Sequence, residues 1–311
     1  MFNFFWVSHP LGGLPCYMNH EYSSQQHLNL LIRFDKISAM SFENKTVIIT
    51  GASRGIGKAI GLRLAKEGAN IVIASKSVEE NPKLGGTIFS AAAEMEAAGG
   101  KALAVQCDIR FEDQIDNVIQ QTVEKFGGID ILINNASAIN LTPTEQTEPK
   151  RFDLMYDINV RGTFMMSRAC IPYLKKGTNA HILNLSPPIN MDMKWFKNHL
   201  AYTISKYDMS MIAIGLAAEL KKYNIAANAL WPRTTIATAA VNNLLGGEML
   251  MKMSRTVDTV ADAAYYILSK SSAECTGNTF IDEEVLAKEG ITNLEKYSLV
   301  PGAQLYTDLF V

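Results

Sequence analysis

Short β-branched runs alternate with amphipathic stretches along most of the chain. Seven apolar runs have the length and composition of buried strands, at residues 46–50, 71–74, 102–107, 129–133, 181–185, 225–230 and 279–281. Between them, the pattern predicts helices over residues 56–67, 87–98, 112–126, 150–174, 200–223 and 257–269. Strands that alternate with helices indicate right-handed crossovers and a parallel sheet covered on both faces. We therefore predict an α/β fold, a doubly wound parallel sheet of about seven strands in a single domain.

The two ends of the chain depart from this pattern. Residues 1–40 have no sustained period, so we expect a flexible N-terminal extension before a domain at residues 41–311. A start codon placed too early, with Met40 as the working start, fits that interpretation equally; a targeting segment or an interface arm is the alternative. Residues 283–311 are less periodic, and we expect them to pack on the surface of the domain.

Composition narrows the class of protein. Of 311 residues, 48% are hydrophobic, which is enough for a large core, and the net charge of −2 argues against a bulk nucleic-acid binder. The apolar runs are far shorter than the ~20 residues of an integral membrane helix. The four cysteines and five histidines lack metal-ligand spacing, so we expect no metal site. The cysteine pattern favours a reducing compartment: the cytoplasm or, if residues 1–40 are a targeting segment, an organellar matrix.

A glycine-rich turn separates the first predicted strand from the first predicted helix. It reads Thr50-Gly51-Ala52-Ser53-Arg54-Gly55-Ile56-Gly57. In such a turn Gly51 permits the tight bend, Gly55 lets backbone N–H groups approach a pyrophosphate, and Gly57 allows close helix–strand packing. The helix N-terminus favours the negative charge of the phosphates. The pattern predicts a dinucleotide site made by Gly51, Ser53, Arg54, Gly55, Ile56 and Gly57; a turn without a ligand is the alternative.

The end of the second predicted strand indicates which dinucleotide is bound. An NAD site places an acid there for the ribose 2′-hydroxyl, whereas an NADP site uses cations for the 2′-phosphate. This chain has Ser75-Lys76 at that point and Arg54 in the glycine-rich turn, with no acid. We expect NADP as the cofactor, with NAD less favoured. Two solvated surface charges are the alternative interpretation of Arg54 and Lys76.

Tyr202 and Lys206 lie four residues apart at the start of the predicted helix 200–223 and therefore share one helix face. An isolated tyrosine has a pKa near 10, too high for a base at neutral pH. An ammonium ion about 4 Å away, at an effective dielectric of ~20, would favour the phenolate by roughly 4 kcal/mol, or about 3 pKa units. The pair is a candidate for proton transfer.

These motifs, with Asn134-Asn135-Ala136 after the fourth predicted strand and Asn159 in the long helix, have the order and spacing of a known family. Over residues 41–282 the chain resembles the short-chain dehydrogenase/reductase family. The resemblance implies a Rossmann-type fold and a homo-oligomer, dimer or tetramer, formed through the helices 150–174 and 200–223. It also implies an oxidoreductase that moves a hydride between a nicotinamide and a carbinol or carbonyl carbon.

The resemblance further implies roles for individual residues. Tyr202 would be the general acid/base, Lys206 would lower its pKa and bind the nicotinamide ribose, and Asn159 would hold a water that links Lys206 to solvent. Other residues would contact the cofactor: Asn135 and Ala136 along its length, Asp108 at the adenine, and Ile236 and Thr238 near the carboxamide. A helix-packing amide is the alternative for Asn159, and a helix cap is the alternative for Asp108.

Two positions depart from the family pattern. Pro187 stands where the second serine of the usual Ser-Ser pair is expected, which leaves Ser186 as the candidate to polarise the substrate. Arg233 follows Pro232 where the family has glycine. A dinucleotide-binding sensor or scaffold with little turnover is therefore the alternative function. Both departures resemble one subgroup of the family whose members carry a further sterol-carrier domain; we expect no such domain in a chain that stops at Val311.

The substrate class is indicated by two apolar segments, at residues 186–199 and 244–253. In this kind of fold both border the crevice at the carboxyl ends of the strands. They carry flexible or aromatic side chains such as Met191, Trp195 and Met249, which suit an adaptable apolar pocket. We expect a lipid-like alcohol, ketone or aldehyde as substrate; ordinary core or a subunit contact is the alternative interpretation.

Overall fold

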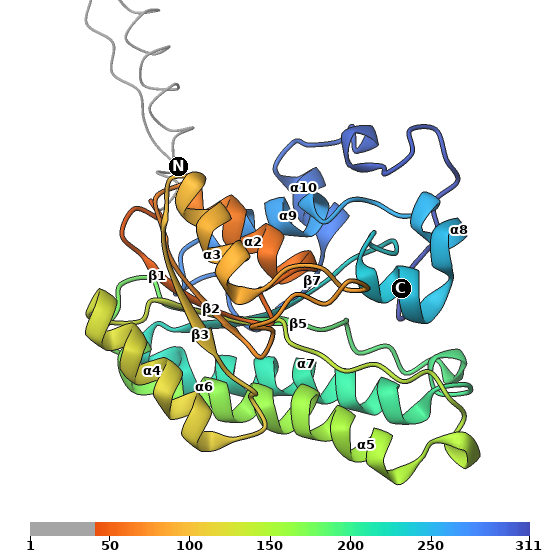
Figure 1. Ribbon diagram of the computed structural model, residues 1–311, viewed down its shortest axis with the longest axis horizontal. Coiled ribbons are helices and arrows are strands. Elements are labelled where there is room, and N and C mark those ends of the chain that lie inside the picture. Colours follow the sequence, from red (N-terminus) through yellow and green to blue (C-terminus); the bar gives the residue numbers. More distant parts are fainter. Residues whose placement is uncertain (1–40) are drawn as a thin grey trace, which may run out of the picture. The chain divides into compact units, whose positions relative to one another are not determined.

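The strands expected from the sequence form one sheet. The computed structural model describes residues 41–311 (Figure 1). The seven strands run parallel in the order β3-β2-β1-β4-β5-β6-β7. Their bounds are β1 Thr46–Thr50, β2 Asn70–Ser75, β3 Lys101–Gln106, β4 Ile131–Asn134, β5 His181–Leu185, β6 Ala226–Trp231 and β7 Thr279–Ile281. The predicted fold class is confirmed, and the extension predicted for residues 1–40 lies outside the described residues.

Helices cover both faces of this sheet. Their bounds are α2 Gly55–Ala65, α3 Ile88–Ala97, α4 Glu112–Phe126, α5 Pro149–Met155, α6 Thr163–Leu174, α7 Leu200–Leu220, α8 Gly247–Lys252, α9 Asp258–Leu268 and α10 Asp282–Lys288. Figure 1 shows α2, α3 and α9 on one side of the sheet and α4, α6 and α7 on the other. Within residues 41–311, none of these helices has the length and apolar character needed to span a bilayer.

Alternate side chains of the central strand account for the two layers. Val47 and Ile49 of β1 pack in an apolar cluster with α2 and α9, whereas Ile48 packs in a second cluster with α4, α6 and α7. Successive side chains of a strand point to opposite faces. A strand covered on both faces therefore needs consecutive apolar residues, as in the Thr46–Thr50 run.

The expected helix over residues 150–174 is interrupted. A π-helical segment, η2 Tyr156–Gly162, joins α5 to α6. Gly162 allows this segment to approach the loop after β3, because a Cβ there would lie 2.6 Å from Cδ1 of Ile109. Single π-turns are frequent at functional sites, and this one carries Asn159.

The C-terminal segment has one deeply buried side chain. We expected residues 283–311 to pack on the surface of the domain; within them Phe310 is only 2% exposed and packs with Tyr202 and Trp231 in a third apolar cluster. These partners lie on α7 and β6, far away in the sequence. The segment has no periodic pattern of its own that could reveal them.

The strand order places a crevice at the centre of the sheet. From β1 the chain proceeds outward to β2 and β3, then returns to β4 on the other side of β1 and proceeds outward again. The crossovers on the two sides diverge at this reversal, so the carboxyl ends of β1 and β4 border a gap in which ligands of open α/β sheets bind.

Candidate active site

The glycine-rich turn begins this crevice. Gly51 and Gly55 have φ angles of +69° and +60°, which residues with a Cβ rarely adopt, and α2 begins at Gly55. A Cβ at Gly55 would meet nothing closer than 3.7 Å, at the Thr238 side chain, so the backbone is open towards the cavity. Glycine at this point leaves space beside the helix N-terminus, where an anion is favoured. The turn thus fits a dinucleotide pyrophosphate.

Asn135 ties the turn to the end of β4. Its side-chain amide donates to the carbonyl oxygens of Thr50, at 2.9 Å, and Gly51, at 3.2 Å. The Thr50 hydroxyl in turn accepts the backbone N–H groups of Asn135 and Ala136, both at 3.0 Å. Gly57 is required next to this amide, because a Cβ there would lie 2.4 Å from Nδ2 of Asn135. The predicted packing role of Gly57 follows from this close approach.

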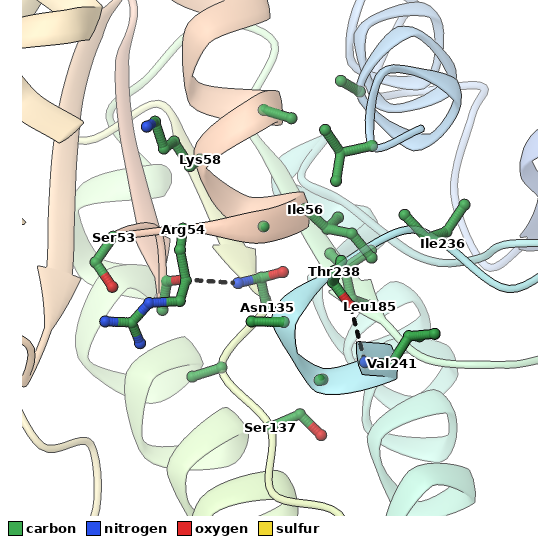
Figure 2. Close-up of a pocket in the computed structure, with 18 of the residues that line it drawn as sticks. Ser53, Arg54, Ile56, Lys58, Asn135, Ser137, Leu185, Ile236, Thr238 and Val241 are labelled. Carbon is green, nitrogen blue, oxygen red and sulfur yellow. Dashed lines mark hydrogen bonds between the residues drawn. The ribbon is translucent and has the colours of Figure 1, made fainter. Parts of the chain in front are cut away.

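A cavity of about 1410 Å³ extends from the turn to the predicted Tyr/Lys pair. Figure 2 shows part of its wall, including Ser53, Arg54, Asn135 and Thr238. Of the residues predicted from the sequence, those on the wall are Gly51, Ser53, Arg54, Gly55, Ile56, Lys76, Asp108, Asn135, Ala136, Tyr202, Lys206, Ile236 and Thr238. The structure therefore brings together, around one cavity, residues from six separate segments of the chain.

One end of the cavity carries the predicted 2′-phosphate residues. Arg54 donates to the carbonyl oxygens of Gly85 and Gly86, at 2.6 and 2.8 Å, so the loop after β2 holds its guanidinium at the cavity wall. Lys76 follows β2 on the same wall. With the Ser53 and Ser75 hydroxyls 3.3 Å apart nearby, this end has hydroxyls and cations suited to a phosphate.

Asp108 is not a helix cap. Its carboxylate binds the Arg110 side chain, at 2.6–3.1 Å, and accepts the Arg110 backbone N–H, while α4 begins after Phe111. The hydrogen bonds from Arg110 keep the pKa of Asp108 below its usual value. An ionised carboxylate on the wall can accept the amino group of an adenine.

Tyr202 and Lys206 lie near the other end of the cavity, one turn apart on α7. The Lys206 ammonium donates to the Leu185 carbonyl at 2.6 Å and reaches the Ser137 hydroxyl at 3.5 Å. It also lies 5.1 Å from the centre of the Trp231 ring. These three contacts fix the lysine in the crevice; they come from β5, from the loop after β4, and from β6.

Burial governs the protonation of the pair. It lowers the pKa of Lys206 to about 7, against a smaller raising effect of Asp308. Burial, and then the Asp308 carboxylate, raise the pKa of the Tyr202 phenol above its ordinary value. From the sequence we expected the lysine charge to lower the pKa of the phenol. In the protein alone, the burial of the phenol outweighs the effect of that charge and raises the pKa.

Two predicted catalytic side chains lie off the cavity wall. The Asn159 amide donates to the Ala138 carbonyl and the Ser205 hydroxyl, at 2.9 and 3.0 Å, and accepts the Ala138 N–H, so this side chain packs the π-turn as the alternative interpretation held. Ser186 is fully buried and its hydroxyl has no hydrogen-bond partner among the described residues. Leu185, the last residue of β5, lines the cavity, whereas Ser186, directly after the strand, is not among the residues of its wall.

Sequence reasoning missed three wall residues beside the pair: Ser137, Trp231 and Asp308. Ser137 directly follows the Asn135-Ala136 motif, so its place could have been read from that motif. Trp231 directly follows the strand predicted at residues 225–230 and ends β6, so the rule that ligands bind at carboxyl ends of strands could have indicated it. For Asp308 no signal exists in the sequence pattern.

Comparisons with known proteins agree with this geometry. The family model described as short chain dehydrogenase matches residues 45–247. Hydroxysteroid dehydrogenase-like protein 2 of Bos taurus is 58% identical over 266 residues, and its Danio rerio counterpart 57%; the match covers 86% of this chain and 63% of each relative's length. A short chain dehydrogenase structure from Mycobacterium thermoresistibile is 52% identical, with a TM-score of 0.83 and 87% and 96% of the two chains covered.

The family match includes strands β1 to β6, the glycine-rich turn and the segment that carries Tyr202 and Lys206. The comparisons confirm both the family and the narrower likeness to one of its subgroups. The chain belongs to the short-chain dehydrogenase family of NAD(P)-dependent oxidoreductases.

Proposed function

We propose that this protein is an NADP-dependent oxidoreductase that interconverts an apolar alcohol and its ketone or aldehyde, with Tyr202 as general acid/base. The observation that carries the proposal is the single cavity that joins the glycine-rich turn to Tyr202 and Lys206. A dinucleotide is long enough to need both ends of such a crevice, and this family binds one there.

The preference for NADP rests on charge. Arg54 and Lys76 stand on the wall at the carboxyl end of β2, where an NAD site needs a carboxylate. The wall carries Ser75, Lys76 and Ser77 there instead. Two cations favour the 2′-phosphate of NADP over the bare hydroxyl of NAD.

The bound nicotinamide supplies the site that donates or accepts the hydride. The chain's own residues handle the proton: the Tyr202 hydroxyl lies on the wall, donates its proton to the alkoxide oxygen formed on reduction, and takes it back on oxidation. Lys206, held by the Leu185 carbonyl, offsets the negative charge of the phenolate. Ser137 offers a hydroxyl 3.5 Å from the ammonium, whereas Pro187, at the position of the family's second serine, has none.

An apolar substrate fits the surroundings of Tyr202. Trp231, Ile139 and Leu185 line the cavity near the pair, and Leu244 from the second apolar segment lines it further out. Of the first segment, Trp195 and Phe196 pack beside Tyr202, whereas Met191 is largely exposed. Apolar walls with few polar groups select lipid-like alcohols and carbonyl compounds.

The assembly is proposed as a homo-oligomer through α6 and α7. Phe164, Met211 and Ile214 on these helices are apolar and about half exposed. Neighbouring exposed apolar side chains on two long helices are typical of an interface between copies.

Turnover tests the proposed enzyme. Purified protein is mixed with NADPH and a panel of long-chain aldehydes, terpenoid ketones and steroid ketones, and NADPH consumption is followed. We expect consumption with at least one apolar substrate, and a loss of at least about a thousandfold in Tyr202→Phe with NADPH still bound. The control is Tyr207→Phe, which removes a buried hydroxyl from the same helix off the cavity wall. It costs the two hydrogen bonds between that hydroxyl and the Asn190 backbone, and activity stays within about tenfold.

A sensor or scaffold with little turnover is the second candidate, favoured by Pro187 and by the burial of Ser186 off the cavity wall. Tight NADPH binding without consumption of NADPH on any substrate of the panel would establish it in place of the enzyme. Failure to bind either nucleotide would exclude both.

A further inference from the structure

The last residues of the chain run along the carboxyl end of β6. Thr307 forms an antiparallel bridge with Thr234, and the Asp308 N–H donates to the Arg233 carbonyl at 2.9 Å. The Trp231 indole donates to the Leu309 carbonyl at 2.8 Å. Backbone contacts at three successive residues fix this C-terminal segment, residues 307–311, against the site.

Phe310 anchors the C-terminal segment. Its ring is surrounded by five others, with ring centres 5.3–6.2 Å away: Tyr207, Trp195, Trp231, His199 and Tyr202. It also has a φ of +73°, a left-handed conformation that non-glycine residues adopt only when their surroundings impose it. The aromatic cluster therefore determines where the neighbouring residue, Asp308, lies.

Asp308 is held in the wall of the cavity with Tyr202, Lys206 and Trp231. Its carboxylate accepts the Leu309 N–H at 2.8 Å, which leaves it able to act on charges across the cavity. The Lys206 ammonium lowers the pKa of Asp308, and the Asp308 carboxylate raises the pKa of both Lys206 and Tyr202. Burial raises the pKa of Asp308 to about 6, so the group is an anion at neutral pH.

The other ionisable groups of the surrounding elements have partners of their own. Arg233 pairs with Glu284 of α10, and Arg255 pairs with Glu283. Asp282 accepts the backbone N–H groups of Arg233 and Glu283. His199, before α7, contacts the Thr203 hydroxyl, and burial lowers its pKa. Lys194 and Asp192, on the loop before α7, lie 3.9 Å apart in solvent.

We propose that Asp308 is a positioning residue of this active site: its carboxylate holds the Lys206 side chain as an ammonium ion beside Tyr202. The inference rests on the proposed function, in which that ammonium supports the phenolate. Burial alone would favour a neutral lysine in the crevice, and the Asp308 carboxylate opposes that loss of charge.

The sign of its effect does not depend on which group of the pair loses the proton. Removing a nearby anion favours deprotonation of either Tyr202 or Lys206, because both losses make the site more negative or less positive. The two groups titrate as a coupled pair with apparent pKa values of their own. Asp308→Asn must therefore lower the first apparent pKa of the pair, with an expected shift of about one unit.

The test uses Asp308→Asn in the full chain, since an asparagine oxygen can still accept the Leu309 N–H. Two readouts are followed against pH: kcat/KM with NADPH and the best substrate of the panel, and the tryptophan fluorescence of the nucleotide-free protein. The Lys206 ammonium lies over the Trp231 ring, so the fluorescence reports its charge; subtracting the same titration of Trp231→Phe removes the other two tryptophans. Asp116→Asn, an exposed site on α4 off the cavity wall, is the matched control.

We expect both midpoints to fall by about one pH unit in Asp308→Asn and to stay unchanged in Asp116→Asn. Should Asp308→Asn not fold, Phe310→Leu, which loosens the anchor, must displace the fluorescence midpoint in the same direction. A fluorescence midpoint that is the same in wild type and variant overturns the inference, whatever the activity. A wild type that does not consume NADPH but shows the displaced fluorescence midpoint refutes the proposed function and still supports the coupling of Asp308 to Lys206.

Discussion

Replacing Gly57 by alanine tests the packing that forms the dinucleotide crevice. The new methyl group would lie 2.4 Å from Nδ2 and 2.9 Å from Cγ of Asn135. That amide cannot simply rotate away, because it is held by the Thr50 and Gly51 carbonyls. Either the amide gives up those hydrogen bonds or α2 moves away from the end of β4.

The magnitude follows from three contributions. Overpacking costs about 1–3 kcal/mol, and each lost hydrogen bond costs about 1 kcal/mol. Alanine in place of glycine within a helix raises the free energy of unfolding by about 1 kcal/mol. We expect Gly57→Ala to lower the free energy of unfolding by about 1–3 kcal/mol. We also expect NADPH to bind at least about tenfold more weakly, equivalent to 1.4 kcal/mol, because the displaced Asn135 borders the turn.

The matched control is Gly61→Ala in the same helix. Its methyl group would also lie 2.4 Å from a neighbour, but that neighbour is Cε of Met95, the free end of a flexible side chain. The helix-propensity gain therefore offsets the contact, and the unfolding free energy stays within about 1 kcal/mol of wild type. Urea unfolding and a fluorescence titration with NADPH measure both quantities. Equal stability and equal NADPH affinity in the two variants would refute the reasoning.

Three further changes have defined outcomes. Burial lowers the pKa of His181 from 6.5 to about 4, so the fold requires a neutral ring and has this part of its stability in full above pH 6.5. Up to about 3 kcal/mol of unfolding free energy is lost as the pH falls towards 4. Urea unfolding of His181→Gln should lack that part of the pH dependence. Lys76→Asp should weaken NADPH binding and strengthen NADH binding, each by about tenfold in equilibrium titrations, and an unchanged ratio would contradict the NADP assignment. Ile214→Lys should convert the oligomer to a smaller species in sedimentation, and a monomeric wild type would contradict the proposed interface.

Local patterns were sufficient for the sheet and the dinucleotide turn. The β-branched runs specify strands that are buried on both faces, and Gly51, Gly55 and Gly57 lie close together where β1 leads into α2, so both features can be recognised from neighbouring residues. Tyr202 and Lys206 are also local, since four residues along one helix bring them to the same face. For these features the sequence by itself determined the element and which residues share its turn or face.

The tertiary structure alone decided which other groups share the crevice. Ser186, directly after β5, is buried off the cavity wall, and the Asn159 amide is hydrogen-bonded to Ala138 and Ser205. Asp308 enters the wall because Phe310 packs among rings contributed by α7, β6 and the loop before α7. Such contacts join residues far apart in the chain, and burial then sets the charge of Lys206 and Tyr202; no periodic pattern encodes either effect.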